Sequence, residues 1–362
     1  MTGYRLFGAP RQYIQGPGLV DRLAELTAGH GNYPLLVVDE FVLTELGARL
    51  TASFDERGTD YGVLPCAGEV TRTNIAAHVT RVADRAYDVV VGIGGGKTLD
   101  LAKGIAIEFD AAMITCPTIA SNDGPTARVA AIYNDDHVLC ELGKLEFNPS
   151  CVVVDSELIS RAPVQFLISG IGDAIAKKFE AEGCRLGTGA TMQGTRPLEI
   201  GGIVAAGCYE VLARHATEAV ESVQKSTLTP AVESVIEAVV LMSGIGYENG
   251  GLSIAHCMTR GLMSGRGTRS VLHGYHVAYG LLVQLVLERH RDDVFDEVAG
   301  LLRAIGLPTM LADMGMTDAS ATEIRELAAA AMTAPHVLNT PAHVTEETLV
   351  DAITRVEYLA RH

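Results

Sequence analysis

The sequence predicts an α/β dinucleotide-binding domain with a parallel sheet, followed by an all-α domain. Three observations predict this. Short apolar runs alternate with amphipathic segments up to Ala162, and alternation of strand and helix is typical of a parallel sheet with covered faces. After Pro163, apolar residues recur at helical spacing to the end of the chain. A run of three glycines stands between one apolar run and the helical pattern that follows it. We therefore expect domains over 1–162 and 163–362, with the active site in the cleft between them.

The expected strands of the first domain are its short apolar runs. They are residues 35–39, 61–66, 89–93, 112–116 and 151–155. Helical patterns lie between them, for example over 70–86 and 98–107. Residues 129–133 and 137–141 flank Asn134, Asp135 and Asp136, a sequence that predicts a β-hairpin. The second domain shows no convincing strand.

Composition limits the classes of protein to consider. With 362 residues, 48% of them hydrophobic, the chain is long enough for two domains with cores of their own. A formal net charge of -16 argues against nucleic acid or an anionic membrane as a partner. No stretch has the roughly 18 uncharged apolar residues of a membrane span, and the N-terminus does not resemble a signal peptide. The seven cysteines include no Cys-x-x-Cys pair, so we expect reduced packing residues in a cytoplasmic protein.

The glycine run over Gly94, Gly95 and Gly96 is the most informative stretch. It follows a buried strand and opens a helix, where free N–H groups attract anions, so it predicts a cradle for a pyrophosphate. A tight turn without a ligand is the alternative. The nucleotide-triphosphate loop would need a glycine at Val91, and the ordinary dinucleotide fingerprint would need one at Lys97, so neither motif is present.

Asp39 ends the strand over 35–39. An acidic residue there can accept the adenosine ribose hydroxyls and repel a 2′-phosphate, which favours NAD over NADP. A helix cap for residues 40–49 is an equally good interpretation of the same aspartate.

Three residues of the second domain could hold a metal. Asp173 follows a Gly-x-Gly sequence, His256 lies in an apolar helix, and His273 opens another helix. One Asp and two His are a reasonable set for a catalytic divalent metal, because they leave coordination positions open. A cap residue and two ordinary histidines would produce the same pattern, so spacing alone leaves both interpretations open.

The motifs together resemble the glycerol dehydrogenases of the iron-containing alcohol dehydrogenase superfamily, which have the dehydroquinate synthase-like architecture. Residues 94–103 match Gly-Gly-Gly-Lys-Thr-x-Asp-x-Ala-Lys, and the Gly-x-Gly-Asp-Ala, Gly-Gly-Leu-x-x-Ala-His and His-Gly motifs follow in the family's order. The resemblance implies NAD as the cofactor and zinc bound by Asp173, His256 and His273. Many iron-using relatives have a further histidine at the position of Lys177, which favours zinc here. His276 is not a family ligand, and we interpret it as packing or as support for a ligand.

The loop over 117–133 resembles the family's substrate segment, although its turn-forming residues would also suit a plain surface loop. By that match Asp123 contacts substrate hydroxyls. The residues implied to surround the cofactor on this segment are Thr118, Ser121, Ala127, Val129 and Tyr133. Gly96, Lys97 and Asp100 would contact its phosphates and ribose. Ala127 replaces a frequent serine, which removes one hydrogen bond.

These observations predict reversible, zinc-dependent and NAD-linked interconversion of a secondary alcohol, such as glycerol or a related diol, and its ketone. Zinc would lower the proton affinity of the substrate oxygen, and hydride would pass to the nicotinamide. We expect a small-molecule substrate and a homo-oligomer. Three alternatives remain open: a dehydrogenase of an anionic substrate such as a phosphorylated polyol or hydroxy acid, a sugar-phosphate cyclase of the dehydroquinate synthase type, and a non-catalytic nucleotide or metal sensor.

Three cations stand close in sequence to the expected metal ligands. Lys177 lies one helical turn after Asp173, and Arg266 and Arg269 precede His273. Surface salt bridges are the simpler explanation. The functional interpretation is an anion-binding site for a carboxylate or phosphate on the substrate.

Overall fold

The computed structural model describes residues 3–134 and 139–361. They form two compact units, an α/β unit over 9–162 with 226–228 and a helical unit made by the rest. Residues 3–8 group with the helical unit, whereas the expected boundary at 162 places them in the first domain. The reason is hydrogen bonding: Asn249 Oδ1 accepts from Gly8 N at 2.9 Å, and Asn249 Nδ2 donates to Gly8 O at 2.8 Å.

The α/β unit is built on a six-stranded sheet in which every pairing is parallel, with the strand order β1-β8-β5-β4-β2-β3. Its strands are β1 (Tyr13–Gly16), β2 (Pro34–Asp39), β3 (Gly62–Cys66), β4 (Val89–Gly94), β5 (Ala112–Pro117) and β8 (Cys151–Asp155). The five predicted strands and the parallel sheet are confirmed. The sequence did not predict β1, because its four half-buried residues lack an apolar run and take their strand form from pairing with β8 at the sheet edge.

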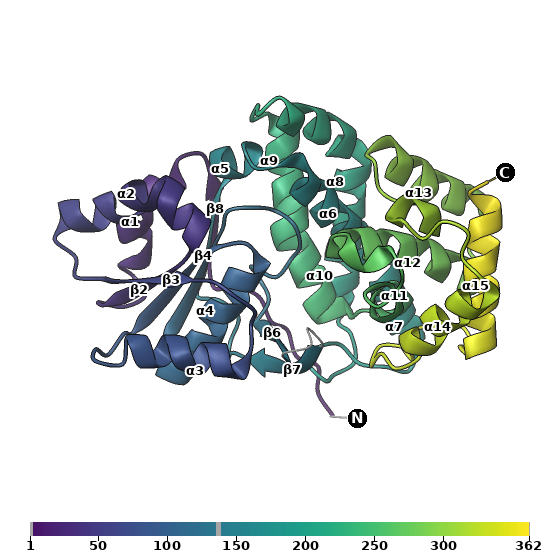
Figure 1. The fold of residues 1–362 in the computed structure, drawn as a ribbon, viewed down its shortest axis with the longest axis horizontal. Helices are drawn as coiled ribbons and strands as arrows, with labels where there is room; N and C mark the ends of the chain where they lie inside the picture. The colour runs from purple at the N-terminus through teal and green to yellow at the C-terminus, as the bar shows by residue number, and fades with distance from the viewer. Residues whose placement is uncertain (1–2, 135–138, 362) are drawn as a thin grey trace. The chain divides into compact units, whose positions relative to one another are not determined.

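Helices cover both faces of this sheet (Figure 1). Alternate residues of β2 divide between two cores: Leu36 and Val38 pack with α1 (Leu23–Thr27) and α2 (Glu40–Arg57), while Leu35 and Val37 pack with the helices of the other face. Those are α3 (Arg72–Arg81) and α4 (Gly96–Phe109). A short 3-10 helix, Leu19–Arg22, precedes α1, and α5 (Ser156–Ser160) follows β8. Burial on both faces explains why these strands are continuous apolar runs.

The predicted hairpin is present as a separate two-stranded antiparallel sheet. It consists of β6 (Val129–Tyr133) and β7 (Leu139–Lys144). The expected second strand over 137–141 begins in residues 137–138, and these, like Asp135 and Asp136, lie outside the described residues.

The chain direction across the sheet reverses between β2 and β4. From β2 the chain continues through α2 to β3 on one side, and from β4 it continues through α4 to β5 on the other. Val38 pairs with Ile93, so Asp39 and Gly94 end neighbouring strands at the same edge. Ligands of open α/β sheets bind at such a topological switch point, where the following helices diverge.

Among the described residues, the helical unit contains ten α-helices. They are α6 (Val164–Ile175), α7 (Lys177–Leu186), α8 (Glu199–Gln224), α9 (Pro230–Glu237), α10 (Ser243–Gly250), α11 (Ile254–Leu262), α12 (His273–Leu287), α13 (Asp292–Ala304), α14 (Ala321–Ala331) and α15 (Glu346–Leu359). A π-turn over Ala238–Met242 joins α9 to α10, and 3-10 turns cover Thr268–Ser270 and Leu311–Met314. The expected absence of strands after Pro163 holds for the residues described.

Helix α12 is the central element of this unit. It packs against α6, α11, α13 and α15 (Figure 1), and most of its residues are buried. The segment Pro230–Gly250 is long and apolar enough to cross a membrane, but 61% of its apolar window is buried inside the fold and it contains Glu233 and Glu237. It is therefore a core helix.

Lys103 fixes one loop of the α/β unit from within. Its side chain is fully buried, and its Nζ donates to Gly124 O at 2.8 Å, to Val129 O at 2.9 Å and to Asp100 Oδ1 at 3.3 Å. Asp100 Oδ2 accepts from Ala131 N at 3.2 Å, so the pair ties α4 to the middle of the loop that leads into β6 and to β6 itself.

Lys103→Met should lower the free energy of unfolding of the protein by about 3 kcal/mol, because it leaves the Asp100 carboxylate without its buried counter-charge. Urea titration of the full chain measures this. Lys97→Met is the matched control, since the Lys97 ammonium is 69% exposed in its pair with Glu69 and such pairs contribute about 0–1 kcal/mol. Equal losses in the two variants would contradict the role given to Lys103.

Candidate functional site

The three expected metal ligands lie together in the helical unit. Asp173 is in the last turn of α6, His256 in the first turn of α11, and His273 is the first residue of α12. One ligand atom from each lies within 4.8 Å of the others. Asp173 Oδ1 is 3.2 Å from His256 Nε2 and 3.8 Å from His273 Nε2. The structure therefore brings the predicted set to one point.

Two glycines beside the ligands allow this approach. A Cβ on Gly274 would lie 1.7 Å from Ser169 O, and one on Gly172 would lie 2.4 Å from Gly274 O. Neither position has room for a side chain. The backbones of α6 and α12 are therefore in contact next to Asp173 and His273. The glycines next to Asp173 and His273 are thus required for the two helices to pack this closely.

Glu180 orients His256, and the sequence analysis did not single it out. Its side chain is completely buried, and Oε2 lies 2.7 Å from His256 Nδ1. Oε1 accepts from the backbone N–H groups of Ser253 and His256, at 2.8 and 3.0 Å. A proton on Nδ1 leaves Nε2 as the atom that can bind a metal. Its spacing from Asp173 could have identified Glu180 in the sequence, because Glu180 follows Asp173 by two helical turns and so lies on the same helix face.

The charges of this cluster are paired. Burial would raise the pKa of Asp173, but Lys177 and His256 outweigh it and hold that pKa well below its usual range. Burial opposes a charge on His256, yet Glu180 and Asp173 raise its pKa to about 9. Glu180 is also buried, and His256 and Lys177 keep its pKa below the ordinary value. The Asp173 and Glu180 carboxylates thus lie against Lys177 and His256 in a dry environment.

These residues fit a divalent metal. The donor set is one carboxylate oxygen and two imidazole nitrogens, which suits zinc and leaves a position for a substrate oxygen. A catalytic metal site needs one side open to the substrate. The Asp173 side chain is 2% exposed, whereas that of His273 is 43% exposed. The open side of the cluster is therefore at His273.

The expected cofactor residues lie together in the α/β unit. Gly95 caps α4, and Thr118 N donates to Gly94 O at 3.1 Å. A Cβ on Gly95 would lie 3.1 Å from Ile119, and one on Gly96 would lie 3.2 Å from Asn122, so the segment after β5 lies directly against the glycine run. Lys97, at the start of α4, donates to Glu69 at 2.8 Å.

The predicted substrate loop is well fixed. Thr115 Oγ1 donates to Pro125 O at 2.8 Å, and Asn148 Nδ2 donates to Thr126 O at 3.0 Å. The Asp123 carbonyl accepts from Thr126 N at 3.2 Å. Ala127 is buried, and the remaining expected cofactor residues of this segment are Ser121 before Asp123 and Val129 and Tyr133 on β6. Their contacts with a ligand remain predictions.

Asp39 is a helix cap in the structure. Its Oδ1 accepts from Phe41 N at 3.0 Å and from Val42 N at 3.3 Å, at the start of α2. Both bonds go to one oxygen, and the residue is half-buried at the switch point of the sheet. The cap does not exclude a ribose contact through the other oxygen, so that role stays a prediction.

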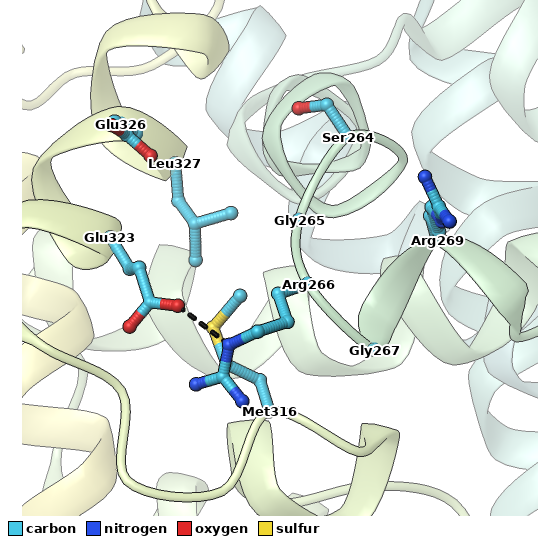
Figure 2. Close-up of a pocket in the computed structure, with 9 residues that line it drawn as sticks. All are labelled: Ser264, Gly265, Arg266, Gly267, Arg269, Met316, Glu323, Glu326 and Leu327. Carbon is cyan, nitrogen blue, oxygen red and sulfur yellow. Dashed lines mark hydrogen bonds and ion pairs between the residues drawn. The ribbon is translucent and has the colours of Figure 1, made fainter.

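The three cations that were expected to bind an anion lie in two different surroundings. Arg266 and Arg269 line a pocket of about 450 Å³ on the helical unit (Figure 2). Arg266 Nε donates to Glu323 at 2.8 Å across this pocket, and its Nη2 donates to Thr317 O at 3.1 Å. Lys177 instead lies among the metal ligands, with Nζ 2.6 Å from Asp173 Oδ1. The charge of Arg266 is thus matched by Glu323, and a shared anion site remains a prediction.

His276 supports the segment before α12. It is buried, and its Nε2 lies 2.8 Å from the carbonyl oxygen of Thr268. A proton on Nε2 makes this hydrogen bond and leaves Nδ1, which has no partner among the described residues, as the unprotonated nitrogen. The expected packing role fits these contacts.

Comparison with known proteins agrees with this geometry. The family model of iron-containing alcohol dehydrogenase matches residues 14–163. Glycolaldehyde reductase of Halobacterium salinarum is 34% identical over 357 residues and covers 98% of each chain. Glycerol dehydrogenase of Pseudomonas putida is 33% identical over 359 residues, 99% of this chain and 98% of its own. The crystal structure of a probable glycerol dehydrogenase from Sinorhizobium meliloti 1021 matches with a TM-score of 0.91 and 36% identity, covering 99% of both chains.

The chain therefore belongs to the iron-containing alcohol dehydrogenase family, and it is an NAD-dependent alcohol dehydrogenase. Within that family its similarity is to glycerol dehydrogenases over nearly the whole length, which confirms the resemblance found in the motifs.

Asp173→Asn and His256→Ala should each abolish zinc binding, because a site with three ligands rarely survives the loss of one. Glu180→Gln should weaken it by about 10- to 100-fold, because Oε1 faces two backbone N–H groups and the amide nitrogen would then stand in place of Oε2, where it cannot accept the Nδ1 proton. Zinc retained per chain after gel filtration, and competition with a chromophoric chelator, measure both effects. Glu182→Gln is the control, because Glu182 lies on the same helix with a side chain that is 48% exposed. Full zinc occupancy in Asp173→Asn would refute the assignment.

Proposed function

We propose that this chain is a zinc-dependent enzyme that interconverts small vicinal diols or polyols, with glycerol as the model substrate, and the corresponding ketones, using NAD. The observation that carries the proposal is the convergence of Asp173, His256 and His273 within 4.8 Å, with the open side at His273. The similarity to glycerol dehydrogenases and to a glycolaldehyde reductase supports small hydroxylated substrates.

In this proposal the α/β unit binds the cofactor and the helical unit binds the metal and the substrate. The α4 N-terminus after Gly94 and Gly95 would hold the pyrophosphate through its backbone N–H groups. Asp100 and Lys97 would contact the phosphates and ribose, and the β6 residues would line the nicotinamide. The segment held by Lys103 keeps these groups in place before the cofactor arrives.

The side chains of the helical unit would act by position and charge. A bound zinc supplies a Lewis acid that lowers the pKa of the substrate hydroxyl. Glu180 holds the Nδ1 proton of His256 and so directs Nε2 to the ligand position. Asp123 would accept a hydrogen bond from the neighbouring hydroxyl of the diol and so select substrates that have one.

We further propose a cytoplasmic protein that works as a homo-oligomer. Six of its seven cysteines are buried and all seven are free thiols, which fits a reducing compartment. Light scattering during gel filtration gives the number of subunits.

The role of Asp39 can be separated from its capping role. Asp39→Asn keeps a good N-cap but removes the charge that repels a 2′-phosphate. We expect kcat/KM with NADP to rise by about tenfold or more, with an unchanged melting temperature. Asp39→Gly should relax the preference as well. Wild-type turnover of NADP as fast as NAD would show that Asp39 does not select the cofactor.

A substrate panel tests the reaction itself. NADH formation is measured with zinc against diols, polyols, hydroxy acids and phosphorylated polyols, and the reverse reaction against glycolaldehyde and hydroxyketones. We expect net NADH formation with neutral vicinal diols, a result that a cyclase or a sensor cannot give. Anionic substrates that outcompete every neutral diol would favour the anion site instead, and Lys177→Ala and Arg269→Ala should then raise KM for those substrates alone.

A further inference from the structure

Lys177 contacts two of the three proposed metal ligands. Its Nζ lies 2.6 Å from Asp173 Oδ1 and 3.3 Å from His256 Nε2. The same Oδ1 atom is the one that faces both histidines, at 3.2 and 3.8 Å. The ammonium and a metal ion would therefore need the same carboxylate oxygen and the same imidazole nitrogen.

The fold holds Lys177 in this position. Asp173 ends α6 and Lys177 begins α7, so four residues of nearly continuous helix place both side chains on one face. The Lys177 side chain is 1% exposed, and its Nζ lies 5.9 Å from the centre of the Tyr247 ring. Surface lysines exchange partners freely, whereas this one is enclosed with its charge against a buried carboxylate.

The charge of Lys177 affects how well a metal ion can bind beside it. The Asp173 carboxylate already contacts the Nζ of Lys177 at 2.6 Å, and the Glu180 carboxylate already contacts His256 Nδ1 at 2.7 Å. A divalent ion added beside an ammonium in a dry site meets a like charge at close range, which is unfavourable in low dielectric. Metal can bind well only if the Nζ of Lys177 moves away from Asp173 Oδ1.

We propose that Lys177 is an internal cation that competes with the divalent metal for Asp173 and His256, and so weakens the metal affinity of this enzyme. The proposal rests on the metal ligands assigned under the proposed function. It makes Lys177 a residue that determines metal occupancy, and it implies that the enzyme loses its metal more readily than a variant without this ammonium.

The test compares metal affinity, not activity. Full-length wild type, Lys177→Met and Lys177→Gln are stripped with a chelator and titrated with zinc in competition with a chromophoric chelator. Both variants remove the charge, and the glutamine retains a polar side chain in case methionine disturbs the fold. We expect both to bind zinc about tenfold or more tightly than wild type. Lys178→Met is the matched control, because the Nζ of Lys178 lies 4.1 Å from the centre of the Tyr209 ring and not among the ligands.

The outcomes are distinct. Equal affinities in wild type and the two Lys177 variants, or weaker binding in the variants, would overturn the proposal while leaving the metal site intact. Failure of all three to bind zinc at any concentration, as expected for Asp173→Asn, would instead refute the metal centre. A crystal structure of the wild type with zinc gives a second test, since the Nζ of Lys177 must then lie beyond hydrogen-bond distance from Asp173 Oδ1.

Discussion

The helical unit is organised around one buried carboxylate. Asp173 lies on α6 next to the point where two glycines let the backbones of α6 and α12 touch. Its Oδ1 atom faces Lys177, His256 and His273. An unpaired carboxylate in such a place would be very costly, so these neighbouring side chains are required for the helices to pack as they do. Because two of these neighbours are imidazoles, the same arrangement that surrounds the carboxylate also creates a possible set of metal ligands.

The α/β unit depends on a comparable buried pair, but with another purpose. Lys103 and Asp100 connect α4 to the loop that carries Asp123, so the helix whose N-terminus would hold the pyrophosphate also fixes the substrate loop. The switch point between β2 and β4 places Asp39 and Gly94 on adjacent strands. A cofactor bound there would meet residues that come from distant parts of the sequence and are already held by hydrogen bonds within the unit.

In our proposal, Lys177 adjusts a metal site without changing a ligand. The three proposed ligands and Glu180 form an arrangement that fits zinc, and one additional ammonium on the same helical face alters its charge. The ammonium already lies against the Asp173 carboxylate, and a divalent ion at the same oxygen would add a like charge beside it. Metal occupancy would then depend on the movement of one side chain, a property that the identity of the ligands does not determine.

The sequence by itself determined the class of fold, most of the sheet and the three residues that we propose as metal ligands. Strands buried on both faces are recognisable as apolar runs, and glycines beside Asp173 and His273 are recognisable as motifs. Edge strand β1 and the position of residues 3–8 were not predictable, because both depend on pairing with distant residues, Val152 and Asn249 among them. The contact of Glu180 with His256 and the direct pairing of Lys177 with the Asp173 carboxylate were decided only by the tertiary structure. A charged residue on a helix has the same local pattern whether it faces solvent or a buried imidazole, and only packing determines which.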